Sequence, residues 1–270
     1  MKNHIYRYDD IVIGGNLASL IFAYLNKFRL IITKPELPYP FEFFDSQRDL
    51  SKLKIQNIQK TLISPTGEVS FGLGKCELYE NLYYRLAMTG KIIYELPTQS
   101  IRVNKENNLL KIISDRSRLY HFKYKRLYTF HKDIIGLEFD IDTKQYEIIN
   151  EFEVSRCYKH DYECLSEQDG GIINIGLFPS YTQLITSTKI DKDRLDPHID
   201  FYIKNYLEKY LRTITVHHPK HLTKVVNKKT IRKEILEEKV VQCDNIQLIT
   251  LSEENILDGK SDSKEQLVCI

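Results

Sequence analysis

Two adjacent glycines near the start of the chain form the pattern that most suggests chemistry. Gly14 and Gly15 follow a short apolar run at 10–13 and precede apolar residues at helical spacing, and a second apolar run at 30–33 comes next. This order predicts a strand, a tight turn, a helix and a second strand. The bare amides and the dipole of a helix that begins at such a turn can bind a pyrophosphate.

The turn departs from the full dinucleotide pattern, which is G-x-G-x-x-G followed by an acid at the end of the second strand. Gly14 is the first glycine, Asn16 stands at the second position and Ser19 at the third. Asn adds bulk where a phosphate would approach, but it tolerates positive φ, and Ser still allows close packing. Thr33 or Lys34 takes the place of the acid, and a lysine cannot accept a hydrogen bond from a ribose. Two interpretations stay open: a nucleotide site, or a turn that binds no nucleotide.

Length and composition set the broad class. The chain has 270 residues, enough for one large or two small domains, and 42% of them are hydrophobic, enough for a substantial core. The net charge of +2 shows no polyelectrolyte signature. The sequence has no apolar run long enough for a membrane helix and no apolar stretch typical of a signal peptide at its start. Five widely spaced cysteines without a CxxC motif indicate reduced thiols, so we expect a cytoplasmic protein.

The next part of the chain alternates strand and helix patterns. Three prolines at 35–40 indicate an extended segment, and 50–62 fits a short helix or strand. Leucines from Leu78 onward predict a helix that ends at Gly90. A strand is expected at 92–96, and a β-meander is expected to comprise 100–103, 109–114, 119–124 and 126–130.

Later segments are predicted from the same signals. We expect strands at 172–178, 182–190 and 245–251, and helices at 197–211 and at about 263–268. The basic stretch 220–233 is followed by glutamates at helical spacing, which favours a solvated, salt-bridged helix over an anion site. No aromatic residues interleave with this stretch, so nucleic acid is an unlikely partner.

The order of these pieces resembles the flavin amine oxidase class of FAD-binding proteins, to which UDP-galactopyranose mutase and protoporphyrinogen-oxidase-like proteins belong. Three segments, 178–187, 227–236 and 251–254, resemble the mutase branch most. The class has a glycine-containing turn after its last strand, whereas this chain has Ser252, Glu253 and Glu254 there. The chain is also shorter than is usual for the class.

This resemblance implies an α/β fold, namely a Rossmann-like FAD/NAD(P)-binding fold with a β-meander and a smaller β-rich second lobe. The FAD-binding domain would be discontinuous, built from 1–36, 68–135 and 241–270, and the inserted lobe would comprise 37–67 and 136–240. The cofactor would be FAD. The activity implied is that of an oxidoreductase or flavin-assisted enzyme acting on a small, conceivably anionic substrate in the cleft between the lobes.

The resemblance also implies a set of cofactor-binding residues, while no catalytic residue can be named. The residues expected around the pyrophosphate are Gly14, Gly15, Asn16, Ala18 and Ser19. Lys34 would stand at the ribose, Gln99 or Ser100 would offer backbone groups to the adenine, and Ser252 and Glu253 would lie near the flavin ring. The arginines that could hold an anion, by neighbourhood alone, are Arg85, Arg194, Arg212 and Arg232.

The competing hypothesis is a non-catalytic scaffold or partner subunit that keeps the fold and no longer binds flavin. A metal site is not expected, because Pro219 interrupts the histidines His217, His218 and His221 and no carboxylate lies among them. Nothing in the sequence brings His131 and His160 together as an acid–base pair. A protein partner is possible in either case, and no membrane partner is expected.

Overall fold

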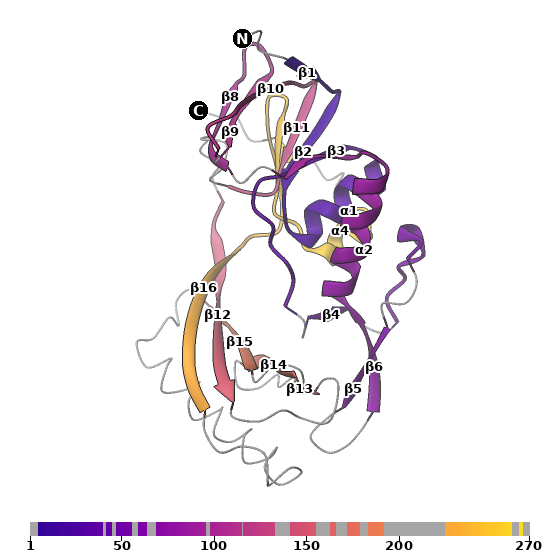
Figure 1. Cartoon of the computed structure of the whole chain (residues 1–270), viewed down its shortest axis with the longest axis vertical. Helices are drawn as coiled ribbons and strands as arrows, with labels where there is room; N and C mark the ends of the chain where they lie inside the picture. Colours follow the sequence, from indigo (N-terminus) through magenta and orange to yellow (C-terminus); the bar gives the residue numbers. More distant parts are fainter. Residues whose placement is uncertain are drawn as a thin grey trace.

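The computed structural model describes most of the chain. The described residues are 5–39, 42–44, 47–55, 59–63, 69–95, 98–114, 116–132, 141–154, 163–165, 172–178, 183–191, 225–260 and 265–266. The molecule has one part that contains the helices and a mainly parallel sheet, and a second part that is built of strands (Figure 1).

The central sheet of the described chain has seven strands in the order β19-β17-β18-β11-β2-β3-β7. In that order they span Glu265–Gln266, Val240–Cys243, Ile246–Ile249, Arg126–Thr129, Asp10–Gly14, Arg29–Ile32 and Ile92–Glu95. β2 pairs in parallel with β3 on one side and with β11 on the other, and β11 pairs in parallel with β18. β17 runs antiparallel to its neighbour β18. The predicted strand–turn–helix–strand unit is therefore confirmed.

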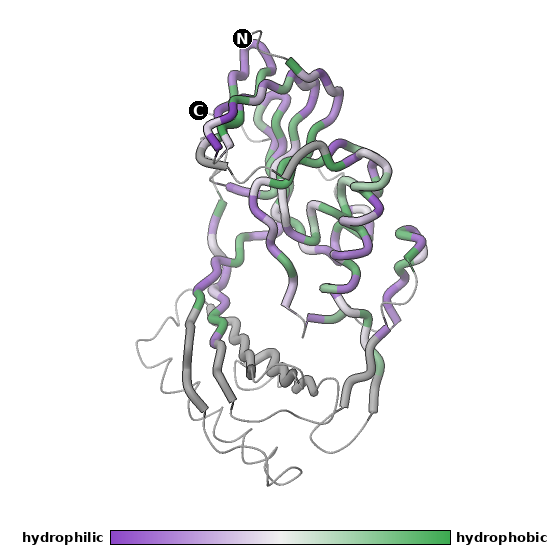
Figure 2. The backbone as a smooth tube through the Cα atoms, in the orientation of Figure 1, coloured by the Kyte–Doolittle hydropathy of each residue, from purple (hydrophilic) through white to green (hydrophobic). Residues whose placement is uncertain are grey.

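Both faces of this sheet are buried, which explains why its strands are continuous apolar runs. Val12 and Leu30 face the helices, whereas Ile11, Ile13 and Ile31 face a second sheet. All five are fully buried, and each contributes roughly 1.5–3 kcal/mol of hydrophobic stabilisation. In Figure 2 these strands are coloured as hydrophobic along much of their length.

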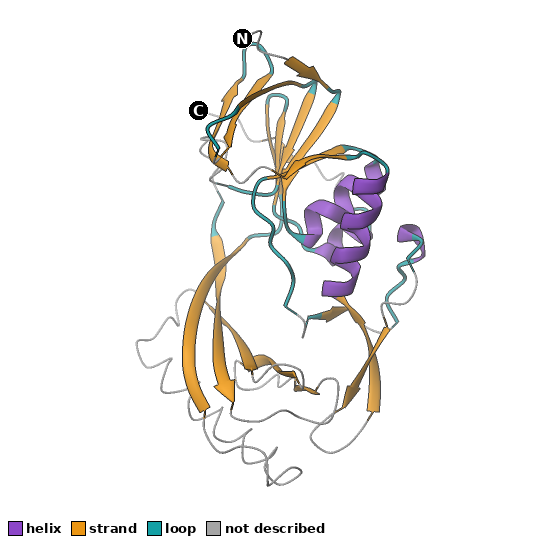
Figure 3. Ribbon diagram, viewed as in Figure 1, coloured by secondary structure: helices purple, strands orange, loops and turns teal. Residues whose placement is uncertain are grey.

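The helices of the described chain gather on one face of the sheet (Figure 3). They are α1 (Leu17–Asn26), α2 (Lys75–Met88) and α4 (Glu253–Leu257). α1 connects β2 to β3 and packs against both α2 and α4. α2 ends as predicted beside Gly90, whose φ of 64° lies in the left-handed region that a residue with a side chain rarely adopts.

The other face is covered by a four-stranded sheet in the order β1-β10-β9-β8. These strands span Ile5–Arg7, Leu119–Lys123, Leu109–Ser114 and Thr98–Asn104. The meander is confirmed for β8, β9 and β10, which pair antiparallel in succession. The expectation that 126–130 continues it is wrong, because β11 pairs with β2 and β18 in the parallel sheet.

The second part of the molecule is made of two further sheets. One has the order β13-β14-β15-β12-β16, and its strands span Glu163–Leu165, Ile172–Phe178, Gln183–Asp191, Thr143–Val154 and Val225–Leu236. The other, in the order β4-β6-β5, spans Phe43–Phe44, Val69–Gly74 and Gln59–Ile63. A 3₁₀ turn, η1 (Ser51–Leu53), precedes β5, so 50–62 contains both a short helical turn and a strand.

Two sequence predictions of helix are wrong. The end of the basic stretch belongs to strand β16, because 225–236 pairs antiparallel along the length of β12. Part of the predicted terminal helix is strand β19, which pairs in parallel with β17. The predicted helix at 197–211 lies outside the described residues.

Two further findings concern the expected compartment. Cys76 is not part of a disulfide, but Cys243 is, so the expectation that every cysteine is reduced is not met. Among the described residues, none of the helices combines the length and apolar character needed to span a membrane.

Candidate functional site

The glycine turn after β2 is packed against its own chain. The carbonyl of Gly15 accepts hydrogen bonds from the Glu36 amide at 2.9 Å and from the Tyr79 hydroxyl at 3.0 Å. A Cβ on Gly15 would lie 1.8 Å from the carbonyl oxygen of Lys34, and a Cβ on Gly14 would lie 2.3 Å from the Cβ of Ser19. Both glycines are therefore required by the fold itself, whether or not a nucleotide binds.

Asn16 begins α1 as its N-cap. Its Oδ1 accepts a hydrogen bond from the Ser19 amide at 2.9 Å, and the Ser19 hydroxyl donates back to the Asn16 carbonyl at 2.7 Å. The amides of Leu17 and Ala18 have no acceptor within the described part of the chain. Two donors at the positive end of the helix dipole thus remain for an anion.

A cavity of about 770 Å³ opens at the carboxyl ends of the parallel strands. Asn16 follows β2, Phe130 follows β11 and Ser252 follows β18, and all three line the cavity. The connection from β2 leads to β3 on one side, whereas β11 and β18 lie on the other, so this is the switch point of the sheet. Open α/β sheets bind ligands in the crevice at that point.

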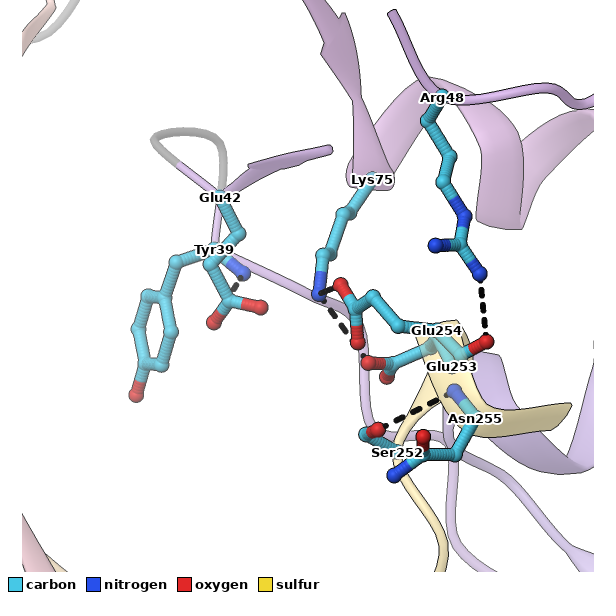
Figure 4. Close-up of polar contacts among 8 residues, drawn as sticks. All are labelled: Tyr39, Glu42, Arg48, Lys75, Ser252, Glu253, Glu254 and Asn255. Carbon is cyan, nitrogen blue, oxygen red and sulfur yellow. Dashed lines mark hydrogen bonds and ion pairs between the residues drawn. The ribbon is translucent and has the colours of Figure 1, made fainter. Parts of the chain in front are cut away.

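The far wall of the cavity is the start of α4, which an ion-pair network holds in place (Figure 4). Lys75, the first residue of α2, places its Nζ 3.1 Å from Glu253 Oε2 and 2.9 Å from Glu254 Oε1. The same ammonium lies 4.6 Å from the ring centroid of Phe44. Arg48 donates to the Glu254 carbonyl at 2.6 Å and pairs with Asp258. Lys75 thereby joins α2 to α4 at the edge of the cavity.

Burial and charge shift the pKa values in this network in predictable directions. Burial lowers the pKa of Lys75, but Glu253 and Glu254 outweigh it and the net pKa is raised. Burial raises the pKa of Glu254, but Lys75 outweighs it and the net pKa is lowered. Burial raises the pKa of Glu42, and the nearby Lys75 offsets this only in part. Lys75 and Glu254 are therefore both charged at neutral pH.

The cavity has an acidic lining. Two lysines, Lys75 and Lys233, are the only cationic side chains that line it within the described chain. The carboxylates that line it are Glu36, Glu42, Glu147, Glu234, Glu238, Glu253 and Glu254. Because Lys75 is already bonded to two of them, the remaining lining has a clear excess of negative charge.

The structure brings together some of the residues expected from the sequence and separates others. Asn16, Ser252 and Glu253 line the same cavity, beside the buried Gly14–Ser19 turn. Ala18 and Ser19 are buried in the first turn of α1 and do not line it. Lys34 is exposed, and Ser100 lies on β8 in the covering sheet.

The arginines expected to hold an anion are not in the described lining. Arg85 donates to the Tyr24 hydroxyl and to the Leu53 carbonyl, each at 3.4 Å, so it links α1, α2 and η1. Arg232 is exposed on β16. Arg194 and Arg212 lie outside the described residues, as do His160 and the histidines at 217, 218 and 221. Within the described residues no group of His, Cys, Asp and Glu could hold a metal ion.

Sequence reasoning missed Lys75 and Glu42, and it left Thr33 as an alternative to Lys34 at the end of the second strand. Lys75 follows two glycines and heads an expected helix, but nothing in the sequence indicated that it reaches Glu253, far along the chain. Thr33 comes directly after β3, and its hydroxyl is buried without a hydrogen-bond partner in the described chain. It occupies the strand-end position at which dinucleotide-binding folds hold a ribose.

Neither protein-family models nor curated protein sequences match this chain. Solved structures do. A geranylgeranyl bacteriochlorophyll reductase-like protein from Thermoplasma acidophilum matches 96% of this chain and 77% of its own, with 13% identity and a TM-score of 0.56. A peptidyl tryptophan dihydroxylase matches 84% of this chain and 56% of its own, with 12% identity and a TM-score of 0.57.

A flavoprotein/dehydrogenase from Cytophaga hutchinsonii matches 90% of this chain and 70% of its own, with 11% identity and a TM-score of 0.50. At these identities the likeness concerns the fold. The fold of this chain is the Rossmann-like fold of FAD-binding flavoproteins, a fold that FAD-dependent enzymes share.

Proposed function

We propose that this chain binds FAD in the cavity at the switch point and acts as an FAD-dependent oxidoreductase. The observation that carries the proposal is the convergence of two segments on one cavity: the capped start of α1 and the start of α4. The solved structures with this fold include a protein described as a flavoprotein/dehydrogenase. The division into an FAD-binding domain at 1–36, 68–135 and 241–270 and an inserted lobe at 37–67 and 136–240 is part of the same proposal.

The polar groups around the turn fit the ADP half of FAD. The start of α1, where Asn16 lines the cavity, would face the pyrophosphate, because it is the positive end of the helix. The orphaned hydroxyl of Thr33 would pair with a ribose hydroxyl, which would relieve the cost of a buried unpaired group. Lys34 is not needed for this role.

The start of α4 would stand at the flavin ring. A bound flavin supplies the electron transfer, and the protein supplies position and electrostatics. Two carboxylates beside the ring would disfavour an anionic reduced flavin, but Lys75 neutralises part of their charge. Glu253 is also drawn onto Lys75, which holds its side chain at a fixed place in the wall.

The acidic lining bears on the substrate and on the branch of the family. Besides the two carboxylates bonded to Lys75, five carboxylates line the cavity, and Lys233 is the one further cation in its described lining. This excess of negative charge favours a neutral or cationic small molecule over the anionic one suggested by the sequence. The mutase branch, in which arginines hold a diphosphate, stays a hypothesis that rests on the sequence. The similar structures named above come from a reductase-like protein, a dihydroxylase and a dehydrogenase.

A second candidate is a scaffold that has this fold without flavin. Two observations favour it: the chain's own packing accounts for both glycines, and the acidic lining repels the phosphates of FAD. The two candidates differ in whether the purified protein binds FAD.

The test is an absorbance spectrum of the purified protein, followed by a calorimetric and thermal-shift titration with FAD. Under the FAD proposal the protein is yellow, dithionite bleaches it reversibly, and FAD at 100 times its dissociation constant adds about 2.7 kcal/mol of stability. A colourless protein that gives no binding heat and no rise in melting temperature with excess FAD would overturn the proposal in favour of the scaffold.

A further inference from the structure

A second cavity, of about 520 Å³, lies at the opposite edge of the central sheet. Its walls are the segments 7–10, 27–29 and 123–125, which come directly before or at the starts of β2, β3 and β11. These strands are parallel, so the cavity lies at their amino ends, whereas the proposed FAD cleft lies at their carboxyl ends.

This second cavity, called the basic cavity below, has an excess of positive charge, whereas the cleft has an excess of negative charge. Its two carboxylates are already paired, Asp9 with Lys125 at 3.0 Å and Asp10 with Arg126 at 2.6 Å. The lining cations without a carboxylate partner in the described chain are Arg7, Lys27, Arg29 and Lys123. Four uncompensated cations around one cavity favour an anionic ligand.

The structural roles of these residues do not account for the charge. Lys27 ends α1 in the left-handed conformation, but it does so with its backbone amide, which donates to the carbonyls of Ala23 and Tyr24. Arg29 donates to the Gly90 carbonyl and lies over the ring of Tyr8 at 5.6 Å, so its position is fixed. The side chains of Lys27, Arg7 and Lys123 make no such contact in the described chain.

Tyr124 gives a second, independent indication of a ligand. It lines the cavity, is only 3% exposed, and its hydroxyl has no hydrogen-bond partner in the described chain. Burial, with a smaller contribution from Asp244, raises the pKa of Tyr124 to about 12. The hydroxyl therefore keeps its proton at any physiological pH. It needs a further group to which it can donate a hydrogen bond, or from which it can accept one.

The aromatic rings in the wall are already used. Arg29 covers Tyr8, and Phe28 stacks on Tyr128 with ring centroids 5.1 Å apart. A ligand would therefore be recognised by its charge and its hydrogen-bond acceptors more than by stacking.

We propose that the basic cavity binds a small molecule that carries a diphosphate group. Its volume lies in the range of small-molecule sites. Guanidinium groups such as those of Arg7 and Arg29 can bind two phosphate oxygens at once. Four positive charges also fit a ligand with several negative charges better than a ligand with a single carboxylate. The diphosphate could be free pyrophosphate or part of a nucleotide, because both present the same chemistry to the cavity. The site is independent of FAD binding at the other edge of the sheet.

The experiment is calorimetric titration of the full chain with inorganic pyrophosphate, without added FAD, because FAD itself carries a diphosphate and would compete for the cavity. The test variant is Arg7→Gln/Lys123→Gln, and both residues are exposed. The matched control is Arg102→Gln/Lys111→Gln, which removes an arginine and a lysine that are also exposed but lie opposite one another on β8 and β9, away from the cavity. The wild type and the control should bind equally well, and the test variant should lose roughly tenfold in affinity.

Tyr124→Phe provides a second measure that keeps the ring. It should weaken pyrophosphate binding severalfold without lowering the melting temperature of the free protein, because it removes a hydroxyl that has no partner. A parallel titration with ADP shows whether the diphosphate is preferred free or within a nucleotide.

Three results would overturn the proposal. One is a wild type that binds neither pyrophosphate nor ADP, and another is a control variant that loses as much affinity as the test variant. The third is a single-stranded oligonucleotide that binds more tightly than pyrophosphate and depends on the same two residues, since that would assign the cavity to nucleic acid. None of these results depends on whether the chain binds FAD.

Discussion

Lys75 shows how one side chain can determine the shape of a site. Its ammonium is mostly buried, bonded to Glu253 and Glu254, and set against the ring of Phe44. Removing one partner of such a group leaves charges that are costly to bury. The residue therefore links the stability of the fold to the geometry of the cleft.

We expect Lys75→Gln to lower the free energy of unfolding by about 2 kcal/mol at pH 7, since two partly buried carboxylates lose their cation. The lowered pKa of Glu254 means that its stabilising contribution is present above its unfolded pKa and is lost as pH falls. The deficit of the variant relative to the wild type should therefore shrink below about pH 4. Urea denaturation between neutral and acidic pH measures it.

Lys111→Gln is the matched control, because Lys111 is exposed on β9 and pairs with no carboxylate in the described chain. It should change stability by less than about 0.5 kcal/mol. A Lys75→Gln deficit that stays constant down to acid pH would show that packing of the lysine stem, and not its charge, stabilises the α2–α4 contact.

At the scale of elements, the first turn of α1 both stabilises the helix and lines the cleft, so substitutions there can change the two properties separately. Asn16 stabilises the helix through its cap, and the same residue lines the cleft. A carboxylate can cap the helix as well as an amide can, but it adds a negative charge at the place where we propose the pyrophosphate.

Asn16→Asp should therefore leave the melting temperature close to that of the wild type and weaken FAD binding by roughly tenfold, whereas Asn16→Ala should lower stability by about 1 kcal/mol. Thermal unfolding and FAD titration of both variants check this. Equal FAD affinity of Asn16→Asp and the wild type would place the pyrophosphate away from α1.

The elements also show what could be predicted from the sequence. The unit from Asp10 to Ile32 and helix α2 were predictable, because local periodicity, capping residues and glycines agree there with the tertiary structure. β16 was not, because Lys233 has Glu147 opposite it on β12, and this partner is distant in the sequence. The spacing of the glutamates suggested helical pairs, but pairing with β12 determined the strand.

The same reasoning limits prediction of the site. Asn16 was a candidate because it opens the helix after the glycine turn, and Ser252 and Glu253 were candidates through the family resemblance. All three line the cavity at one edge of the parallel sheet. Lys34 was assigned by its position after the second strand and by resemblance, and Ser100 by resemblance alone. Neither is among the described residues that line the cleft. Lys75 and the acidic lining depend on contacts between segments far apart in the chain, which a single sequence does not reveal.

At the scale of the whole molecule, the two edges of the central sheet carry opposite charge. The cleft has seven glutamates against two lysines, and the basic cavity has five cations against two aspartates. A net charge of +2 for the whole chain conceals this separation. The two edges should therefore respond to salt in opposite directions.

We expect the affinity for FAD to rise severalfold between about 0.05 M and 0.5 M NaCl, because salt screens the repulsion between the carboxylates and the phosphates. The affinity for pyrophosphate at the basic cavity should fall over the same range. Titration of one preparation with both ligands provides the comparison, with each site as the control for the other. An FAD affinity that falls with salt would mean that its phosphates meet cations instead.

The strand order of the central sheet also affects how the chain folds. β18 lies beside β11, and α4 covers the core that α1 and α2 share, yet both are made long after β2 and β11. During synthesis the edge of β11 would remain unpaired until β18 is made. The apolar residues around Leu17 would remain exposed until α4, which ends at residue 257, has left the ribosome. Such non-local closure is slow, and an open strand edge attracts other chains in the meantime. The nascent chain would therefore expose a strand edge and apolar surface until its last segments are made.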